Sequence, residues 1–182
     1  MITRTLVTLA LVLCVVVVAQ AQREHLTPQE IDLVKEAQVL DKRIDVFIKA
    51  AERRLLVINN AAGSAANAKQ LKKDSERWGE LPTGSRAELV GDIARIFDEA
   101  ITNIDDVSAR DERNPLIAKS LRKLATSVNT ILGQLKPLSV DAKSDAEIAS
   151  FELLNEDAQS ILEAANKLPP EVVDKKAKKN NN

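Results

Sequence analysis

Cysteine and histidine are almost absent from this sequence. Among 182 residues the chain has one cysteine, Cys14, and one histidine, His25. A single thiol gives no disulfide and no zinc thiolate site, and Cys14 lies in a segment that we expect to be removed. A lone histidine provides no Glu-x-x-His pair of the kind found in di-iron bundles, and a Ser-His-Asp triad would depend on His25 near the chain terminus. We therefore predict no catalytic residue, no cofactor and no metal site.

Glycine, proline and aromatic residues are also scarce. The chain has 5 glycines, 6 prolines, 3 phenylalanines, 1 tryptophan and no tyrosine. The glycines stand singly, so no glycine-rich phosphate loop is present. All-β domains need turn residues and aromatic or β-branched strands, whereas the apolar residues here are mostly Leu, Ile, Val and Ala. The composition predicts an all-α protein.

The chain also has no excess of basic residues over acidic ones. The 26 basic residues nearly balance the 27 acidic ones. Loss of Arg4 with an N-terminal signal would leave 25 against 27, a net charge of −2 with the histidine neutral. This balance argues against a dedicated nucleic-acid-binding protein.

The first 21 residues predict export. A basic start with Arg4 precedes an uncharged apolar run from Thr5 to Ala19, and Ala19-Gln20-Ala21 places small residues where a signal peptidase cleaves. The alternative is a permanent membrane anchor. At about 1.5 Å per residue, however, this run spans only about 22 Å, less than the roughly 30 Å of a hydrocarbon core.

Lipid attachment is disfavoured because the bulky Leu13 precedes Cys14 and an apolar run follows it. We expect cleavage after Ala21, a mature chain beginning at Gln22, a periplasmic or secreted location and no stable membrane anchor.

Four amphipathic helices are predicted over 28–60, 86–108, 115–136 and 144–168, because apolar residues recur there at steps of three and four. Capping boxes at Thr27, Ser85 and Ser144 mark three of the starts, and Asn114-Pro115 marks the fourth. The helix over 115–136 has a heptad seam typical of coiled coils. Short connections make neighbouring helices antiparallel, so residues 22–170 are expected to form an antiparallel four-helix bundle.

The connection at 61–84 and the C-terminal tail are less regular. Helical spacing of Ala65, Ala68, Leu71 and Trp78 indicates a short accessory fifth helix at 65–78, and a mobile loop is the alternative. The tail at 171–182 is rich in lysine and asparagine, so we expect it to be disordered.

Four residues are candidate contacts for a ligand or partner: Trp78, Arg54, Lys72 and Lys73. Arg54 lies near a core position. We expect its stem to follow the apolar seam and its head to reach water, the alternative being an internal anion site or a partner contact. Trp78 either plugs one end of the bundle or docks a partner from a mobile segment.

Acidic residues cluster on the second and fourth predicted helices. Facing carboxylates can bind a hard cation such as Ca²⁺, but these fall outside the apolar stripes, as expected of a solvated face. The cluster members are Asp98, Glu99, Asp105, Asp106, Asp141, Asp145 and Glu147.

Two resemblances accompany these patterns. Residues 26–30, Leu-Thr-Pro-Gln-Glu, resemble the Leu-Thr-x-x-Gln signature of small periplasmic stress chaperones, with Glu30 in place of Gln and no second copy. The segments 26–56, 78–89 and 114–116 resemble uncharacterised exported helical-bundle proteins of acidobacterial type, a likeness that implies no activity.

Together these observations predict an exported, non-enzymatic helical-bundle protein that binds, or associates structurally with, a protein or other partner in the cell envelope. The alternatives are a periplasmic chaperone-like or stress-response protein, and a carboxylate-based metal-binding protein or enzyme. The identity of the partner and the oligomeric state stay open.

Overall fold

The computed structural model describes residues 24–59 and 74–170, and these form helices and connections without a strand. The helices are α2 (Pro28–Glu36), α3 (Leu40–Ile58), α5 (Arg86–Arg110), α6 (Pro115–Val140) and α7 (Asp145–Asn166). The predicted all-α class is confirmed. Within the described ranges, no helix combines the length and apolar character needed to cross a bilayer.

Parts of the predicted organisation lie outside the described residues. These are the signal peptide at 1–21, most of the connection at 61–84, and the tail at 171–182. The described end of the connection contains one helical turn at 74–78, followed by an extended stretch that leads to α5.

Helix starts follow the capping signals closely. At α2 the Glu30 amide donates to Thr27 Oγ1 over 3.3 Å, and the Thr27 amide donates to Glu30 Oε2 over 2.9 Å. Ser85 and Glu88 form the same reciprocal pair at α5. At α7 Ser144 accepts from the Glu147 amide, but the Glu147 carboxylate pairs with Arg86 instead of the cap. The third predicted box is therefore only half formed.

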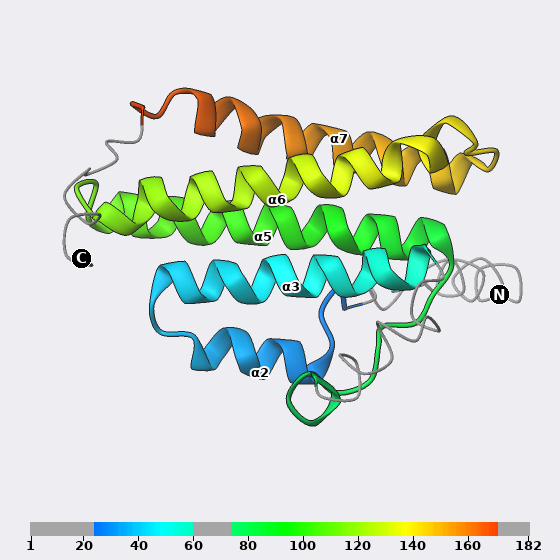
Figure 1. Ribbon diagram of the computed structural model, residues 1–182, viewed down its shortest axis with the longest axis horizontal. Coiled ribbons are helices and arrows are strands. Elements are labelled where there is room, and N and C mark those ends of the chain that lie inside the picture. Colours follow the sequence, from blue (N-terminus) through cyan, green and yellow to red (C-terminus); the bar gives the residue numbers. More distant parts are fainter. Residues whose placement is uncertain (1–23, 60–73, 171–182) are drawn as a thin grey trace, which may run out of the picture.

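The prediction of one long helix over 28–60 is wrong. Helix α2 ends at Glu36, residues 37–39 reverse the chain, and α3 begins at Leu40 (Figure 1). No glycine or proline marks this break. Its cause is tertiary: α2 folds back along α3, where Glu30 meets Arg53 and Arg54 in the interior. Long-range pairing has overridden a local pattern that favours helix.

The other helix ends differ less from expectation. Helix α6 continues to Val140 instead of ending at 136, with Pro137 inside its last turns. Proline removes one backbone hydrogen bond, to the carbonyl of Gly133, so near a helix end the loss is small. Helices α5 and α7 end within two residues of the predicted 108 and 168, the usual extent of fraying.

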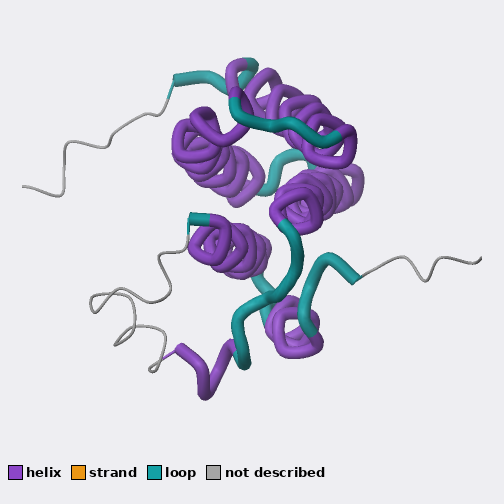
Figure 2. The backbone as a smooth tube through the Cα atoms, turned by 90° about the vertical axis from the view of Figure 1, so that its right-hand side faces the viewer, coloured by secondary structure: helices purple, strands orange, loops and turns teal. Residues whose placement is uncertain are grey.

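The four longest helices lie side by side, with successive ones running in opposite directions (Figure 1). Helix α5 packs against α3 and α7, and α6 packs against the same two helices. Helix α2 contacts α3 and lies outside this group of four, which the view along the helices shows (Figure 2).

The core forms where the apolar stripes of these helices meet. Each contributes fully or almost fully buried side chains at the predicted spacing, and the only phenylalanines are among them. Some stripe residues near the helix ends are only partly buried, and Ile148 at the start of α7 is 42% exposed. The most central members include Ile44, Phe47, Ile93, Phe97, Leu124, Val128, Ile131, Leu135, Leu154 and Ile161.

Truncation of the α6 seam should be costly. Leu124 and Leu135 are at most 1% exposed, so replacing either with alanine loses buried area and leaves a cavity. We expect each change to lower the free energy of unfolding by about 2–5 kcal/mol, as measured by chemical denaturation. Leu153→Ala, at a site that is 40% exposed, is the control and should cost far less. A loss below about 1 kcal/mol at Leu124 would contradict a central position for α6.

Candidate functional site

A cluster of charged side chains is buried where α2, α3 and α5 meet. It contains Glu30 from α2, Arg53 and Arg54 from α3, and Asp92 from α5, none more than 3% exposed. The Arg54 guanidinium binds the Glu30 carboxylate through two contacts of 2.8 Å, one to each oxygen. Arg53 Nε adds a third contact of 3.2 Å to the same carboxylate. Asp92 approaches Arg54 Nε at 3.9 Å and accepts from Arg95 at 3.0 Å.

Other guanidinium donors bind backbone carbonyls, whereas the buried Arg54 Nε has no hydrogen-bond partner in the described part of the chain. Arg54 donates to Ala50 over 2.8 Å and to His25 over 2.5 Å. Arg53 Nη2 donates to the carbonyls of Trp78, Gly79 and Glu80. Two side chains of α3 therefore bind the entry to α2 and the turn at 78–80 simultaneously.

Trp78 and Gly79 complete this turn. The Trp78 ring centre lies 5.7 Å from the Arg53 guanidinium carbon, a cation–π distance. Gly79 has a φ of 66°, and a Cβ at this position would lie 2.8 Å from the Gln29 side chain. Glycine is favoured here because this left-handed backbone conformation is strained for other residues, and any Cβ would also displace the Gln29 side chain.

Burial determines how strongly the charged cluster affects stability. Desolvation lowers the pKa of Arg53, and the nearby Glu30 carboxylate opposes this shift. A buried ion pair is weak evidence for net stabilisation, but removal of one partner leaves a charge buried without compensation. The cluster therefore makes the position of α2 strongly dependent on Glu30.

The four residues predicted as ligand or partner contacts do not form one site in the structure. Arg54 is 1% exposed, so the expectation that its head reaches water is wrong: Glu30 occupies the internal anion position. Trp78 is half-buried and is linked to Arg54 only through Arg53. Lys72 and Lys73 lie outside the described residues.

Sequence reasoning missed Glu30, Arg53 and Asp92 as members of one cluster. Glu30 had a sufficient local explanation, because it is the acidic member of the capping box of α2. Its Oε2 atom serves both roles, accepting from the Thr27 amide and pairing with Arg54. The adjacent pair Arg53-Arg54 on an apolar face was the available signal, since two neighbouring cations there require an anion from elsewhere in the chain.

A groove of about 590 Å³ lies beside Trp78, along the α2–α3 turn. Leu33, Ala37, Val39 and Val46 provide its apolar part. Charged residues of both signs also line it, namely Glu36, Lys42, Asp45 and Arg77.

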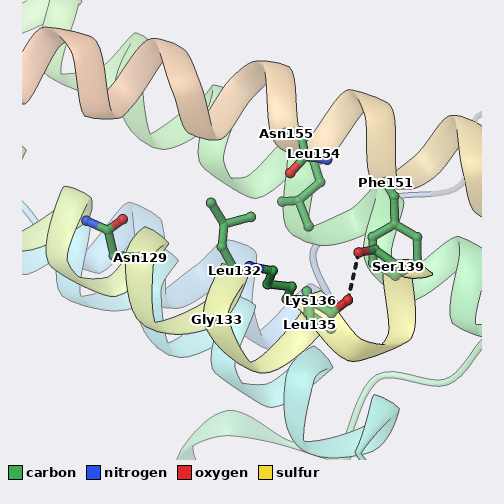
Figure 3. Close-up of a pocket in the computed structure, with 9 residues that line it drawn as sticks. All are labelled: Asn129, Leu132, Gly133, Leu135, Lys136, Ser139, Phe151, Leu154 and Asn155. Carbon is green, nitrogen blue, oxygen red and sulfur yellow. Dashed lines mark hydrogen bonds between the residues drawn. The ribbon is translucent and has the colours of Figure 1, made fainter. Parts of the chain in front are cut away.

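A second groove, of about 390 Å³, runs between α6 and α7 (Figure 3). Leu132 on α6 and Leu154 on α7 point toward each other across it, and Leu135 and Phe151 extend its apolar lining (Figure 3). The polar residues that line it are Asn129, Lys136, Ser139 and Asn155. Lysine is thus its one charged residue, which makes this groove chemically unlike the one beside Trp78.

Gly133 opens the α6–α7 groove. It also lines the groove, and a Cβ added to it would meet no heavy atom within 4 Å. A glycine at this place keeps free a volume that any other residue would partly fill.

The acidic residues singled out in the sequence have separate partners or lie in solvent. Glu99 accepts from His25 Nε2 at 2.7 Å, and Glu147 pairs with Arg86 at 2.7 Å. Within residues 24–59 and 74–170, no three carboxylate, histidine or cysteine side chains gather as a metal-binding group.

One carboxyl group has a markedly shifted pKa. Burial, together with the neighbouring charges of Asp98 and Glu156, raises the pKa of Asp157 on α7 to about 6. The opposite shift occurs at the start of α3, where Lys123 and Lys119 lower the pKa of Asp41. Asp41 thereby ties α3 to α6, at 2.7 Å from Lys123 and 3.0 Å from Lys119.

The comparisons with known proteins add no assignment. No known protein family, curated protein or solved structure matches this chain.

Glu30→Gln tests the dependence on the buried cluster. The amide retains the shape and the capping role of residue 30, but it removes the carboxylate that contacts both buried arginines and leaves Asp92, 3.9 Å from Arg54, as the nearest buried acid of the cluster. We expect the free energy of unfolding to fall by about 3–5 kcal/mol in chemical denaturation. Glu36→Gln, on an exposed part of the same helix, should change it by less than about 0.5 kcal/mol. Equal and small effects of the two variants would show that the cluster does not hold α2.

Asp157→Asn tests the raised carboxyl pKa. A native pKa of about 6, above the ordinary 3.8, means that the folded protein binds a proton more tightly than the unfolded chain. Stability should therefore fall as pH rises from 4 to 7. The variant removes this penalty, so we expect a gain of about 0.5–1 kcal/mol at pH 7.5, allowing for solvent screening, and none at pH 4. Chemical denaturation at both pH values measures this difference.

Glu152→Gln, an exposed change on the same helix, is the control and should give the same free energy of unfolding relative to the unchanged protein at both pH values. A gain for Asp157→Asn at pH 4 equal to that at pH 7.5 would contradict the raised pKa of Asp157.

Proposed function

We propose that this chain is an exported, non-enzymatic protein that binds the apolar face of a partner polypeptide in the α6–α7 groove. In this proposal residues 1–21 are a cleaved signal peptide, and α3, α5, α6 and α7 act as an antiparallel four-helix bundle that supports the groove. The periplasm or the outside of the cell is the place of action. The observation that carries the binding role is the chemistry of the groove.

The groove combines an apolar floor with an almost uncharged rim. Leu135, Phe151 and Leu154 are at most 6% exposed, so their inner surfaces belong to the core while their edges line the groove. Specific pockets are mostly apolar, with a small number of polar groups that orient the ligand. Asn129, Ser139 and Asn155 provide such groups here.

Helix α6 has a long uncharged stretch, and the groove lies along its C-terminal part. No charged residue occurs between Lys123 and Lys136, although 29% of the whole chain is charged. The centres of protein interfaces are depleted in charge in the same way. A solvated helix face without a partner has no comparable reason to lack lysine and glutamate.

An amphipathic helix fits this arrangement. Parallel ridges on either side and an apolar floor accept residues at positions i, i+3 or i+4, and i+7 of a partner helix. Two further apolar residues, Val140 after Ser139 and Ile148 one turn before Phe151, are exposed near the ends of α6 and α7 that line the groove. These exposed apolar residues support the second candidate, a chaperone-like protein that binds unfolded chains with little selectivity.

The two candidates predict different behaviour. A chaperone should suppress aggregation of unrelated unfolded proteins at substoichiometric ratios, and Val140→Ser together with Ile148→Ser should weaken this effect. A selective binder should not suppress aggregation.

Gly133→Phe tests the groove directly. A benzyl group at this open position should fill the apolar floor and block a partner helix without disturbing the core. Gly133→Ala is the matched control, because it leaves most of the volume open and should stabilise α6 by about 1 kcal/mol. A photoreactive amino acid at Asn129, on the groove rim, reports contact with partners in the cells that export the protein.

We expect a discrete cross-linked adduct from Asn129 in the otherwise unchanged protein and in Gly133→Ala, and loss of this adduct in Gly133→Phe. A photoreactive residue at Glu112, in the α5–α6 connection, should not give the same adduct. An adduct that persists in Gly133→Phe, or that forms equally from Glu112, would exclude the groove as the binding site.

A further inference from the structure

Residues 37–39 form a hinge without a local cause. They join α2 to α3, and their sequence, Ala-Gln-Val, contains no helix breaker. Val39 is the N-cap of α3 but offers no side-chain hydrogen bond to it. Both Ala37 (φ −76°, ψ 83°) and Val39 (φ −90°, ψ 129°) have negative φ, so a change in ψ alone brings either close to helical geometry.

The apolar pattern continues through this hinge. Leu33, Ala37, Leu40 and Ile44 follow one another at steps of four, three and four, the spacing of a single helical stripe. Local sequence therefore favours a continuous helix over 28–58, whereas tertiary contacts impose a turn. Such a conflict between local and global preference marks an element with two accessible arrangements.

The contacts that hold the turn closed come from outside it. Glu30 pairs with Arg53 and Arg54, His25 contacts Glu99 and Arg54, and Arg43 donates to the Ala37 carbonyl over 3.0 Å. Except for the last, these contacts join the α2 segment to α3 or α5. They do not require that α2 and α3 belong to the same molecule.

We propose that α2 exchanges between two copies of this chain. In the exchanged dimer residues 37–39 become helical, α2 and α3 form one helix, and α2 packs on α3 of the other protomer, while His25, just before α2, contacts that protomer's α5. Glu30 then pairs with the partner's Arg53 and the partner's Arg54. The arrangement is two-fold symmetric, since each protomer gives its α2 and receives one.

A second copy is the occupant that the buried cluster selects. An unrelated helix on this face would need a carboxylate at the depth of Glu30, or it would leave two buried guanidinium groups with only Asp92, 3.9 Å from Arg54, as a counter-charge within the cluster. Exchange restores the same ion contacts and adds helical hydrogen bonds at each hinge. The entropy of association opposes it, so the dimer should form at high concentration.

Substitutions at Val39 test the exchange. Val39 is 50% exposed and extended, so proline is compatible with the closed hinge, but inside a continuous helix it would remove a hydrogen bond and clash with the preceding turn. Val39→Ala is the matched control: alanine favours the continuous helix and is as poor an N-cap as valine. The protein and its variants are unfolded, refolded at millimolar concentration, and examined by size-exclusion chromatography with light scattering.

We expect a dimer fraction for the unchanged protein, an association constant about threefold higher per hinge for Val39→Ala, and one about 100-fold lower per hinge for Val39→Pro. If Val39→Pro fails to refold, Gln38→Gly carries the same test, with a decrease of about fivefold per hinge. Absence of dimer in both the unchanged protein and Val39→Ala, or equal dimer in the proline and alanine variants, would overturn the proposal.

A second measurement separates exchange from association through another surface. Isotopically heavy and light chains are refolded together and treated with a lysine-reactive cross-linker. Exchange predicts heavy–light links between Lys35 on α2 and Lys49 on α3 in the dimer fraction. Links between these two lysines within one chain only would contradict it. Gly133→Phe should leave the dimer unchanged, so failure of the groove hypothesis and failure of this one are distinguishable.

Discussion

The carboxylate of Glu30 is the group on which the arrangement of the N-terminal half depends. It is fully buried, and it accepts hydrogen bonds or ion pairs from Arg53, Arg54 and the Thr27 amide. Through Arg54 it positions the carbonyl of His25, and through Arg53 it positions the turn at 78–80. One acidic side chain thus connects α2, α3, the approach to α5 and Trp78. Apolar contacts alone would tolerate sliding of a nine-residue helix, whereas a bidentate ion pair sets one position.

Much of the remaining fold follows from local patterns that agree with the tertiary structure. Helices α5, α6 and α7 begin at the predicted caps, and Leu124, Val128, Ile131 and Leu135 are buried as their heptad spacing predicts. Each of these helices has a single apolar stripe, which can be buried only against the core. The spacing of the apolar residues is therefore sufficient to predict which side chains are buried. Pro137 shows that a proline does not always end a helix, because near a helix end it removes only one backbone hydrogen bond.

The hairpin and the candidate site needed information that spacing does not contain. Leu33, Ala37 and Leu40 have the same pattern whether the chain continues or reverses at 37–39. The reversal depends on a pairing between residues 23 and 24 positions apart, Glu30 with Arg53 and Arg54. The α6–α7 groove is likewise invisible in a stripe, because it depends on how two helices pack, with Gly133 among the residues that line it. Absence of charge between Lys123 and Lys136 was its only trace in the sequence.

The two faces of the molecule have opposite chemistry, and this supports a division of roles. Around α2, recognition depends on buried charges with fixed geometry, so only a helix that carries the equivalent of Glu30 can be accommodated. Between α6 and α7 the groove is mostly apolar, with Lys136 as its one charged residue, and apolar contacts adapt to varied helices. Helix α2 contacts α3 but not α6 or α7 among the described helices, so a change at the hinge has no direct route to the groove. Self-association through the first face and partner binding through the second can therefore vary independently.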